Sequence, residues 1–232
     1  MKTFITFDID GTLIKFGGES AKHPLAFRNA FNELFHMNIK EYPLDYIKKN
    51  VYGMTDLQTL IEMMNKANIQ PTNKKIEQFQ KTFEKHYLSI IQPNFNLVPN
   101  ADIFLRELAS KPNLTLGIAT GNFERIAWTK LALTNLDKYF PLHIGGYGNV
   151  IKRSDVIKNS LKNACQKGAG PFDRFIHFGD TSSDAKSALE VGFESVIVKT
   201  GKQKYNFPSG SVVFENFDTD FSNILKFLKS NK

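Results

Sequence analysis

Two carboxylates follow the first apolar run of the chain. Residues 3–7 are apolar and predict a buried strand, and Asp8 and Asp10 come directly after it. Side chains two residues apart at a strand end point to the same side of a sheet. One carboxylate could attack phosphorus, while the other protonates the leaving oxygen and then activates water. Gly11 would let the backbone turn closely around a phosphate. A simple turn that caps the strand also explains this motif taken alone.

A second apolar run ends in groups that suit an anion. Residues 114–120 predict a strand whose end carries Thr120, Gly121 and Asn122, just before a predicted helix. A threonine hydroxyl and backbone N–H groups at the start of a helix can bind a phosphate. This end of the chain's second strand is therefore a candidate phosphate site.

A third apolar run, 175–178, is followed by Asp180 and Asp184. Asp8, Asp10 and Asp180 together could supply oxygen ligands for a hard cation such as Mg²⁺. A carboxylate that approaches a phosphate dianion is repelled by it, and a cation offsets this repulsion. Strand-end motifs so far apart in the chain, each suited to phosphoryl transfer, are hard to explain as turns.

The elements that must position these residues alternate between strands and helices. Strands are predicted at 3–7, 114–120, 142–144, 175–178, 195–199 and 211–214, and helices at 101–110, 124–133, 153–166, 183–191 and 221–228. This alternation predicts an α/β fold, a Rossmann-like doubly wound parallel sheet with helices on both faces. Ligands of such sheets bind at the carboxyl ends of the strands.

The segment 16–93 interrupts the alternation and contains no convincing strand. Helical spacing is present at 25–35, 44–50, 56–67 and 73–90. Glycines at 17 and 18 and the turn at 92–94 are plausible linkers. We therefore predict a catalytic core made of 1–15 and 94–232, and an inserted all-helical cap domain at 16–93.

Composition limits the classes of function. The chain has 232 residues, a formal charge of +7 and a single cysteine. Its lysines are dispersed and form no binding tail, so we predict no nucleic-acid partner. No apolar stretch is long enough to span a membrane and no signal peptide is recognisable, so a cytoplasmic protein is expected. The lone Cys165 rules out an internal disulfide and fits a reducing compartment.

The motifs resemble those of the haloacid dehalogenase-like hydrolase superfamily. The matching residues are Asp8-Ile9-Asp10-Gly11-Thr12-Leu13, the strand-end Thr120, and Gly179-Asp180 followed by Asp184. The resemblance covers essentially the whole chain and is closest to the phosphoglycolate-phosphatase-like branch with an α-helical cap. It implies that Asp8 is the nucleophile and Asp10 the general acid/base, and that Thr120 holds a phosphate oxygen. It also implies that Mg²⁺ is bound by Asp8, the backbone carbonyl of Asp10, and Asp180, with Asp184 as a further ligand or a supporting carboxylate.

The sequence departs from the family pattern at the basic residue of the site. Ile151 stands where the family commonly has lysine, so Arg153 or Lys152 must reach in from a shifted position. We favour Arg153, because arginine can bridge a phosphate and a carboxylate bidentately. His23 is expected to be an exposed loop residue, and His177 a buried core residue.

The resulting hypothesis is a Mg²⁺-dependent phosphatase of a small phosphorylated metabolite, acting as a monomer or homodimer. Substrate contacts are expected from Gly11, Thr12, Gly121, Asn122 and Thr55, although Thr55 could equally cap a helix. A phosphomutase of the β-phosphoglucomutase type would share the core motifs. A non-catalytic binding protein on the same scaffold is a further alternative, although it would need neither a nucleophile nor an acid/base.

Overall fold

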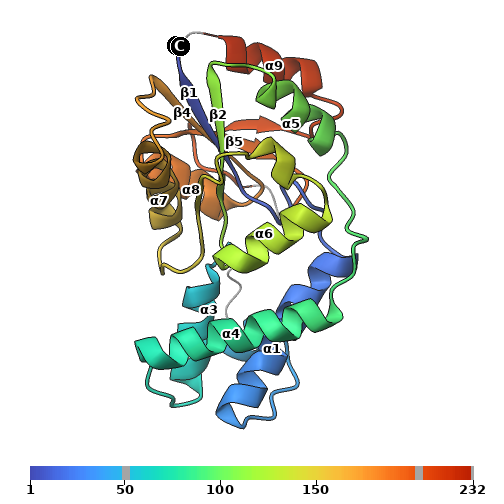
Figure 1. Ribbon diagram of the computed structural model, residues 1–232, viewed down its shortest axis with the longest axis vertical. Helices are drawn as coiled ribbons and strands as arrows, with labels where there is room; N and C mark the ends of the chain where they lie inside the picture. Colours follow the sequence, from blue (N-terminus) through green and yellow to red (C-terminus); the bar gives the residue numbers. More distant parts are fainter. Residues whose placement is uncertain (49–52, 202–205, 231–232) are drawn as a thin grey trace.

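The computed structural model describes residues 1–48, 53–201 and 206–230, and these form a parallel sheet with a helical body at one end (Figure 1). The strand order is β3-β2-β1-β4-β5-β6, and every paired neighbour is parallel. The strands are β1 (Thr3–Phe7), β2 (Leu114–Ala119), β3 (Gly145–Gly146), β4 (Arg174–Gly179), β5 (Glu194–Val198) and β6 (Val212–Phe214). The predicted α/β fold is confirmed.

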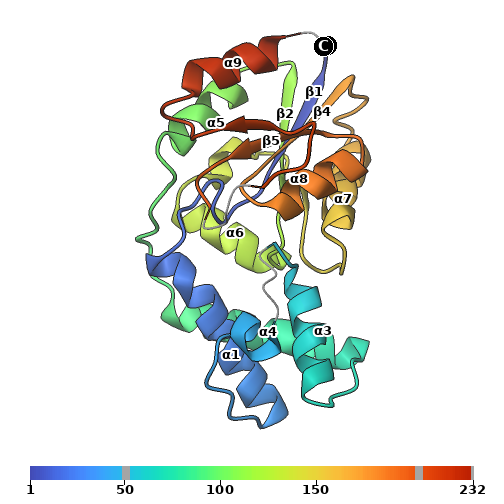
Figure 2. The ribbon, with the colours of Figure 1, turned by 180° about the vertical axis from the view of Figure 1, so that it is seen from behind.

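Helices cover both faces of the sheet (Figure 2). One face packs against α5 (Ala101–Ala109), α6 (Glu124–Leu133) and α9 (Phe221–Lys229) in a cluster that contains Phe7, Phe104 and Phe178. The other face packs against α7 (Arg153–Gln166) and α8 (Ser182–Glu190) around Phe4 and Ile157. All five residues of β1 are buried, and its sequence of threonine, phenylalanine and isoleucine contains no charged residue.

The helices between β1 and α5 pack around a hydrophobic cluster that also includes Phe123 and Ile126, at the start of α6. They are α1 (Lys22–Phe35), α2 (Pro43–Ile47), α3 (Asp56–Lys66) and α4 (Asn73–Ile90), preceded by the short 3₁₀ helix η1 (Gly18–Ala21). In this cluster the rings of Phe79 and Phe83 stack, and Phe27 contacts both of them at steeper ring angles. We call α1–α4 the cap helices. Residue 50, the predicted end of the second of these helices, lies outside the described residues.

The third strand is displaced from its predicted position. The run 142–144 was expected to form it, but the residues that pair with β2 are Gly145 and Gly146. Leu142 is instead largely exposed. A Cβ on Gly146 would lie 1.8 Å from the carbonyl oxygen of Val156 in α7. The close approach of α7 to the sheet therefore requires glycine, a residue that is normally depleted in strands.

Candidate active site

The sheet brings the predicted site residues to one edge. β1 lies between β2 and β4, and Phe7 is in register with Ile118 of β2 and Phe178 of β4. The residues that follow these strands, among them Asp8 and Asp180, therefore emerge side by side. The chain turns to opposite sides of β1 to form β2 and β4, so this edge is also the point at which a doubly wound sheet binds its ligand.

Asp8 is buried beside a guanidinium group. Arg153 Nη2 lies 2.6 Å from Asp8 Oδ1 and 2.7 Å from Asp184 Oδ1, and Arg153 Nε donates to the same Asp184 oxygen at 3.0 Å. Burial raises the pKa of Asp8, although Arg153 opposes this shift. The two carboxylates hold the pKa of Arg153 above its usual range despite its burial. The guanidinium is thus fixed against Asp8 as a permanent positive charge.

The structure separates the two candidate basic residues. Arg153 is 8% exposed and begins α7, so that its side chain runs back toward the end of β1. Lys152, the residue before α7, is exposed and does not line the cavity at Asp8. The favoured Arg153 is therefore the one that contacts Asp8.

Asp184 supports Arg153 from the first turn of α8. Its second oxygen accepts the backbone N–H of Thr181 at 3.1 Å and the Thr181 hydroxyl at 2.5 Å, while Thr181 Oγ1 accepts the N–H of Asp184 in return. This is a capping box at the start of the helix. Burial would raise the pKa of Asp184, but Arg153 outweighs it and holds this pKa well below its usual range. Asp184 is therefore an ionised, fully engaged carboxylate.

Asp8, Asp180 and Asp184 form an acidic cluster that fits a cation. One oxygen of each lies within 4.8 Å of the others. Asp180 Oδ1 accepts the Thr12 hydroxyl at 3.3 Å, whereas Oδ2 is buried and has no hydrogen-bond partner. Burial, together with the Asp184 and Asp8 carboxylates, raises the pKa of Asp180 well above its usual range. An orphaned carboxylate oxygen in such a cluster is the chemistry expected of a ligand for a hard cation.

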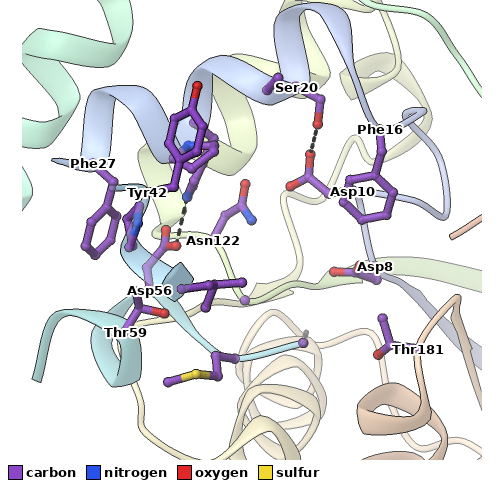
Figure 3. A pocket seen from close by; sticks show the side chains of 18 of the residues that line it. Asp8, Asp10, Phe16, Ser20, Phe27, Tyr42, Asp56, Thr59, Asn122 and Thr181 are labelled. Atoms are coloured by element: carbon purple, nitrogen blue, oxygen red, sulfur yellow. Dashed lines mark hydrogen bonds and ion pairs between the residues drawn. The ribbon is translucent and has the colours of Figure 1, made fainter. Parts of the chain in front are cut away.

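Asp10 is held at both of its oxygens. Ser20 in η1 donates to Oδ1 at 2.9 Å, and Lys130 Nζ in α6 lies 2.5 Å from Oδ2 (Figure 3 shows the Ser20 contact). Burial would raise the pKa of Asp10, but Lys130 and His23 outweigh it and lower this pKa below its usual value. Neither Ser20 nor Lys130 was predicted as a site residue.

The predicted anion site, Thr120–Asn122, directly follows β2. Thr120 is completely buried, and its hydroxyl oxygen accepts the N–H of Asn122 at 3.4 Å. Gly121 and Asn122 line the cavity, and a Cβ on Gly121 would lie 2.6 Å from Arg153 Nη1. Thr12 donates its hydroxyl to Asp180 Oδ1, and its contact with substrate stays a prediction.

A cavity of about 460 Å³ extends from this edge into the cap helices. Asp8, Asp10 and Asn122 lie at its core end, whereas Phe27, Tyr42, Asp56 and Thr59 lie on its cap side (Figure 3). The other lining residues between 16 and 93 are Phe16, Gly17, Ser20, Ala21, His23, Pro24, Pro43, Leu44, Asp45, Gly53 and Met54. The walls on the cap side are therefore largely apolar, with a few polar groups among them.

The expectation for His23 is wrong. It lies on α1, its side chain is only 16% exposed, and its Nε2 is 2.9 Å from Asp56 Oδ1. Its Nδ1 is buried without a hydrogen-bond partner. The α1 helix begins at Lys22, three residues before the predicted start, and this places His23 inside the helix rather than on a loop.

The start of α3 docks the cap helices onto the core. Asp56 Oδ2 accepts the N–H of Phe123 at 2.8 Å, and the backbone N–H groups of Asp56 and Leu57 donate to the carbonyls of Gly121 and Gly148. Thr55 caps α3 by accepting the N–H of Gln58, and it donates to the carbonyl of Val150. The structure therefore shows the capping contact of Thr55. That Thr55 also touches substrate stays a prediction.

This docking gives a first testable expectation. Asp56→Ala removes the acceptor of the Phe123 N–H and the partner of His23, at a cost of about 1–3 kcal/mol for a buried group left unpaired. Hydrogen exchange at the Phe123 amide, followed by NMR, should become at least about tenfold faster. Asp45→Ala, which removes a carboxylate from another cap helix, is the control. Unchanged exchange in Asp56→Ala would contradict the docking role.

A parallel doubly wound sheet with aspartates at its strand ends and helices inserted after β1 defines a class of hydrolase folds. Residues 3–192 of the chain match the family described as haloacid dehalogenase-like hydrolase, and the protein belongs to that family. No curated protein matches the chain. In the described residues, no helix is long and apolar enough to cross a membrane.

Solved structures resemble the chain over nearly its full length. β-Phosphoglucomutase from Clostridium difficile is 17% identical, with a TM-score of 0.70 over 97% of this chain and 96% of that one. A predicted phosphatase from Clostridium acetobutylicum is 18% identical, with a TM-score of 0.69 over 97% and 99%. A predicted phosphoglycolate phosphatase from Haemophilus somnus is 20% identical, with a TM-score of 0.65 over 97% and 98%. At these identities the likeness is one of fold.

Proposed function

We propose that this protein is a phosphomonoesterase that transfers the phosphoryl group of a small phosphorylated metabolite to Asp8 and then to water. The observation that carries the proposal is the position of Asp8, which lines the cavity beside Arg153 while Asp10 lines it nearby. A nucleophilic carboxylate, a fixed cation and an acid/base group facing one cavity are the parts that phosphoryl transfer needs.

In the first step an oxygen of Asp8 forms a bond to phosphorus as the bond from phosphorus to the leaving oxygen breaks. Lys130 and His23 keep Asp10 ionised in the free protein, so Asp10 takes up a proton when the anionic substrate binds beside it; it then gives this proton to the leaving oxygen and becomes a carboxylate again. In the second step Asp10 takes a proton from water as the water oxygen bonds to phosphorus, and Asp8 leaves as a carboxylate. Arg153 stabilises negative charge on the transferring group in both steps.

The phosphate oxygens would be bound on the side of β2. Gly121 and Asn122 line the cavity directly, and Thr120 lies beneath them with its hydroxyl oriented by the N–H of Asn122. At the end of β1, Gly11 has φ of +90°, and a Cβ there would lie 2.4 Å from Asp180 Oδ2. A side chain at position 11 would therefore crowd the acidic cluster, so glycine keeps it open.

Asp8 and Asp180 are the side chains proposed to hold Mg²⁺, with the backbone carbonyl of Asp10. When bound, the ion would neutralise charge on the phosphoryl group and the nucleophile. Asp184 would support the metal site without binding the ion directly, since both of its oxygens already accept hydrogen bonds from Arg153 and Thr181. A cytosolic location is part of the same proposal, because the free Cys165 is exposed and suits a reducing compartment.

The metal assignment predicts a stability effect that does not depend on activity. The raised pKa of Asp180 means that its contribution to stability is present below about pH 3.9, its unfolded pKa, and is lost as pH rises through its folded pKa. In EDTA at neutral pH, Asp180→Asn should therefore be more stable than wild type. Saturating Mg²⁺ should stabilise wild type by about 2.7 kcal/mol at a hundred times Kd and leave Asp180→Asn almost unchanged. Thermal unfolding measures both effects.

Asp218→Asn, which neutralises an exposed carboxylate far from the cluster in sequence, is the matched control for that measurement. It should follow wild type in both EDTA and Mg²⁺. An Asp180→Asn variant that is stabilised by Mg²⁺ as strongly as wild type would remove Asp180 from the metal site.

A panel of phosphomonoesters with wild-type protein and Mg²⁺ tests the function itself. Release of inorganic phosphate from at least one ester, abolished by EDTA, is the expected result. Sugar 1-phosphates belong in the panel, because a phosphomutase would isomerise them rather than release phosphate. Absence of any turnover across the panel would support the alternative of a non-catalytic binding protein.

A further inference from the structure

Lys130 is a buried cation that the nucleophile, metal and phosphate sites leave unexplained. It lies in α6 between Ala127 and Leu131, which pack into the core, and its side chain is 1% exposed. Burying an ammonium group is costly unless it is paired and hydrogen-bonded. An apolar side chain would fill this helix face without that cost, so the reason for a lysine lies in what its Nζ contacts.

Both side chains that accept hydrogen bonds from the Lys130 ammonium group line the cavity. Its Nζ lies 2.5 Å from Asp10 Oδ2 and donates to Asn122 Oδ1 at 2.6 Å. Asp10 and Asn122 come from the ends of different strands, β1 and β2, and both line the cavity. Lys130 therefore links the Asp10 carboxylate, the proposed acid/base group, to Asn122 on the proposed phosphate side of the cavity.

The remaining oxygen of Asp10 is held from the other direction. Ser20, in the short helix that leads into the cap helices, donates to Oδ1 at 2.9 Å. Lys130 belongs to a helix that packs on the sheet, whereas Ser20 belongs to the segment entering the cap. Of these two contacts, the one to Lys130 anchors the Asp10 carboxylate to the core.

We propose that Lys130 is a positioning residue that holds the Asp10 carboxylate at the leaving-group side of the cavity. This inference rests on the proposed function, because it assigns Lys130 a purpose through the acid/base role of Asp10. Lys130 makes no direct contact with Asp8 among the described interactions, and Arg153 already occupies that place. Its effect should therefore fall on the two proton transfers of Asp10, and only the transfer to the leaving oxygen depends on which ester is used.

Two substrates separate this role from simple support of the fold. p-Nitrophenolate is a good leaving group that departs without a proton, whereas the oxygen of an alkyl phosphate needs one. Lys130→Met should lower kcat/KM for an alkyl phosphate such as ethyl phosphate by about 100-fold, and kcat/KM for p-nitrophenyl phosphate by less than about tenfold. kcat/KM reports the steps up to phosphoryl transfer to Asp8, so the comparison leaves out the hydrolysis of the aspartyl phosphate, in which Asp10 acts for both esters.

Companion variants sharpen the test. Lys130→Arg keeps a cation that can reach Asp10 and should recover part of the alkyl phosphatase activity, and Lys130→Gln serves if the methionine variant does not fold. Adding Lys130→Met to Asp10→Asn should cause almost no further loss, because both changes act on one step. Lys138→Met, which removes an exposed lysine, is the control and should behave as wild type.

A crystal structure of Lys130→Met gives a readout without turnover. The Asp10 carboxylate should leave its place, while Asp8 and Asp180 stay. Equal losses of kcat/KM for the two esters, or an Asp10 that does not move, would overturn the inference. If wild type hydrolyses no ester at all, the proposed function fails, and the crystal structure alone decides whether Lys130 positions Asp10.

Discussion

Asp8→Asn is expected to lower the turnover of p-nitrophenyl phosphate with Mg²⁺ by at least about 10⁴-fold, because an amide cannot act as the nucleophile. The exchange removes no volume from the end of β1. It also relieves a buried carboxylate whose pKa is raised by its surroundings. Steady-state release of p-nitrophenolate, with the enzyme in large amount for the variant, measures the loss.

The fold should survive this substitution. Arg153 keeps two hydrogen bonds to Asp184 when the charge of Asp8 is removed, so no buried cation is left unpaired. The thermal midpoint in EDTA should therefore be unchanged or higher than in wild type. A folded Asp8→Asn protein with wild-type turnover would exclude Asp8 as the phosphoryl acceptor.

The second large effect is expected at Arg153. Arg153→Met removes the cation beside Asp8 and should lower kcat by about 10²–10³-fold, as does the loss of one group that stabilises transition-state charge. It also leaves two buried carboxylates facing each other, at a cost in unfolding free energy of about 3–5 kcal/mol. Activity assays and chemical denaturation measure the two losses separately.

Matched variants identify what Arg153 provides. Arg153→Lys keeps the charge but cannot span Asp8 and Asp184 with one planar group, so most of the activity loss should remain. Lys152→Met, a change at the exposed neighbouring residue, should leave both activity and stability near wild type. If Lys152→Met were the more damaging change, the basic residue of the site would be Lys152.

The fold and the strand-end residues could be predicted because the signals are local. Buried parallel strands appear as short apolar runs, and the groups that follow β1, β2 and β4 come together wherever these strands are neighbours. Asp8, Thr120 and Asp180 could therefore be predicted to lie at the ends of neighbouring strands. The division into a core of 1–15 with 94–232 and a cap of 16–93 stays a prediction, and the hydrophobic cluster of α1–α4 also takes in Phe123 and Ile126 from the predicted core segment.

These local signals do not predict the contacts of Lys130 and His23. A lysine on a helix is normally a solvated residue, and only the packing of α6 on the sheet shows that Lys130 is buried against Asp10. His23 pairs with Asp56, which lies on a different helix, so the pair depends on how α1 and α3 pack. The choice between Arg153 and Lys152 likewise required the position of the start of α7.

Trapping the covalent intermediate tests the central claim most directly. Wild-type protein mixed with excess substrate and Mg²⁺ is quenched with borohydride, which reduces an aspartyl phosphate to homoserine, and the peptide containing residues 1–15 is sequenced by mass spectrometry. The account predicts homoserine at position 8 and unchanged aspartate at position 10, in a substrate-dependent manner. Active enzyme with no modification at position 8, or with the modification at another carboxylate, would contradict it.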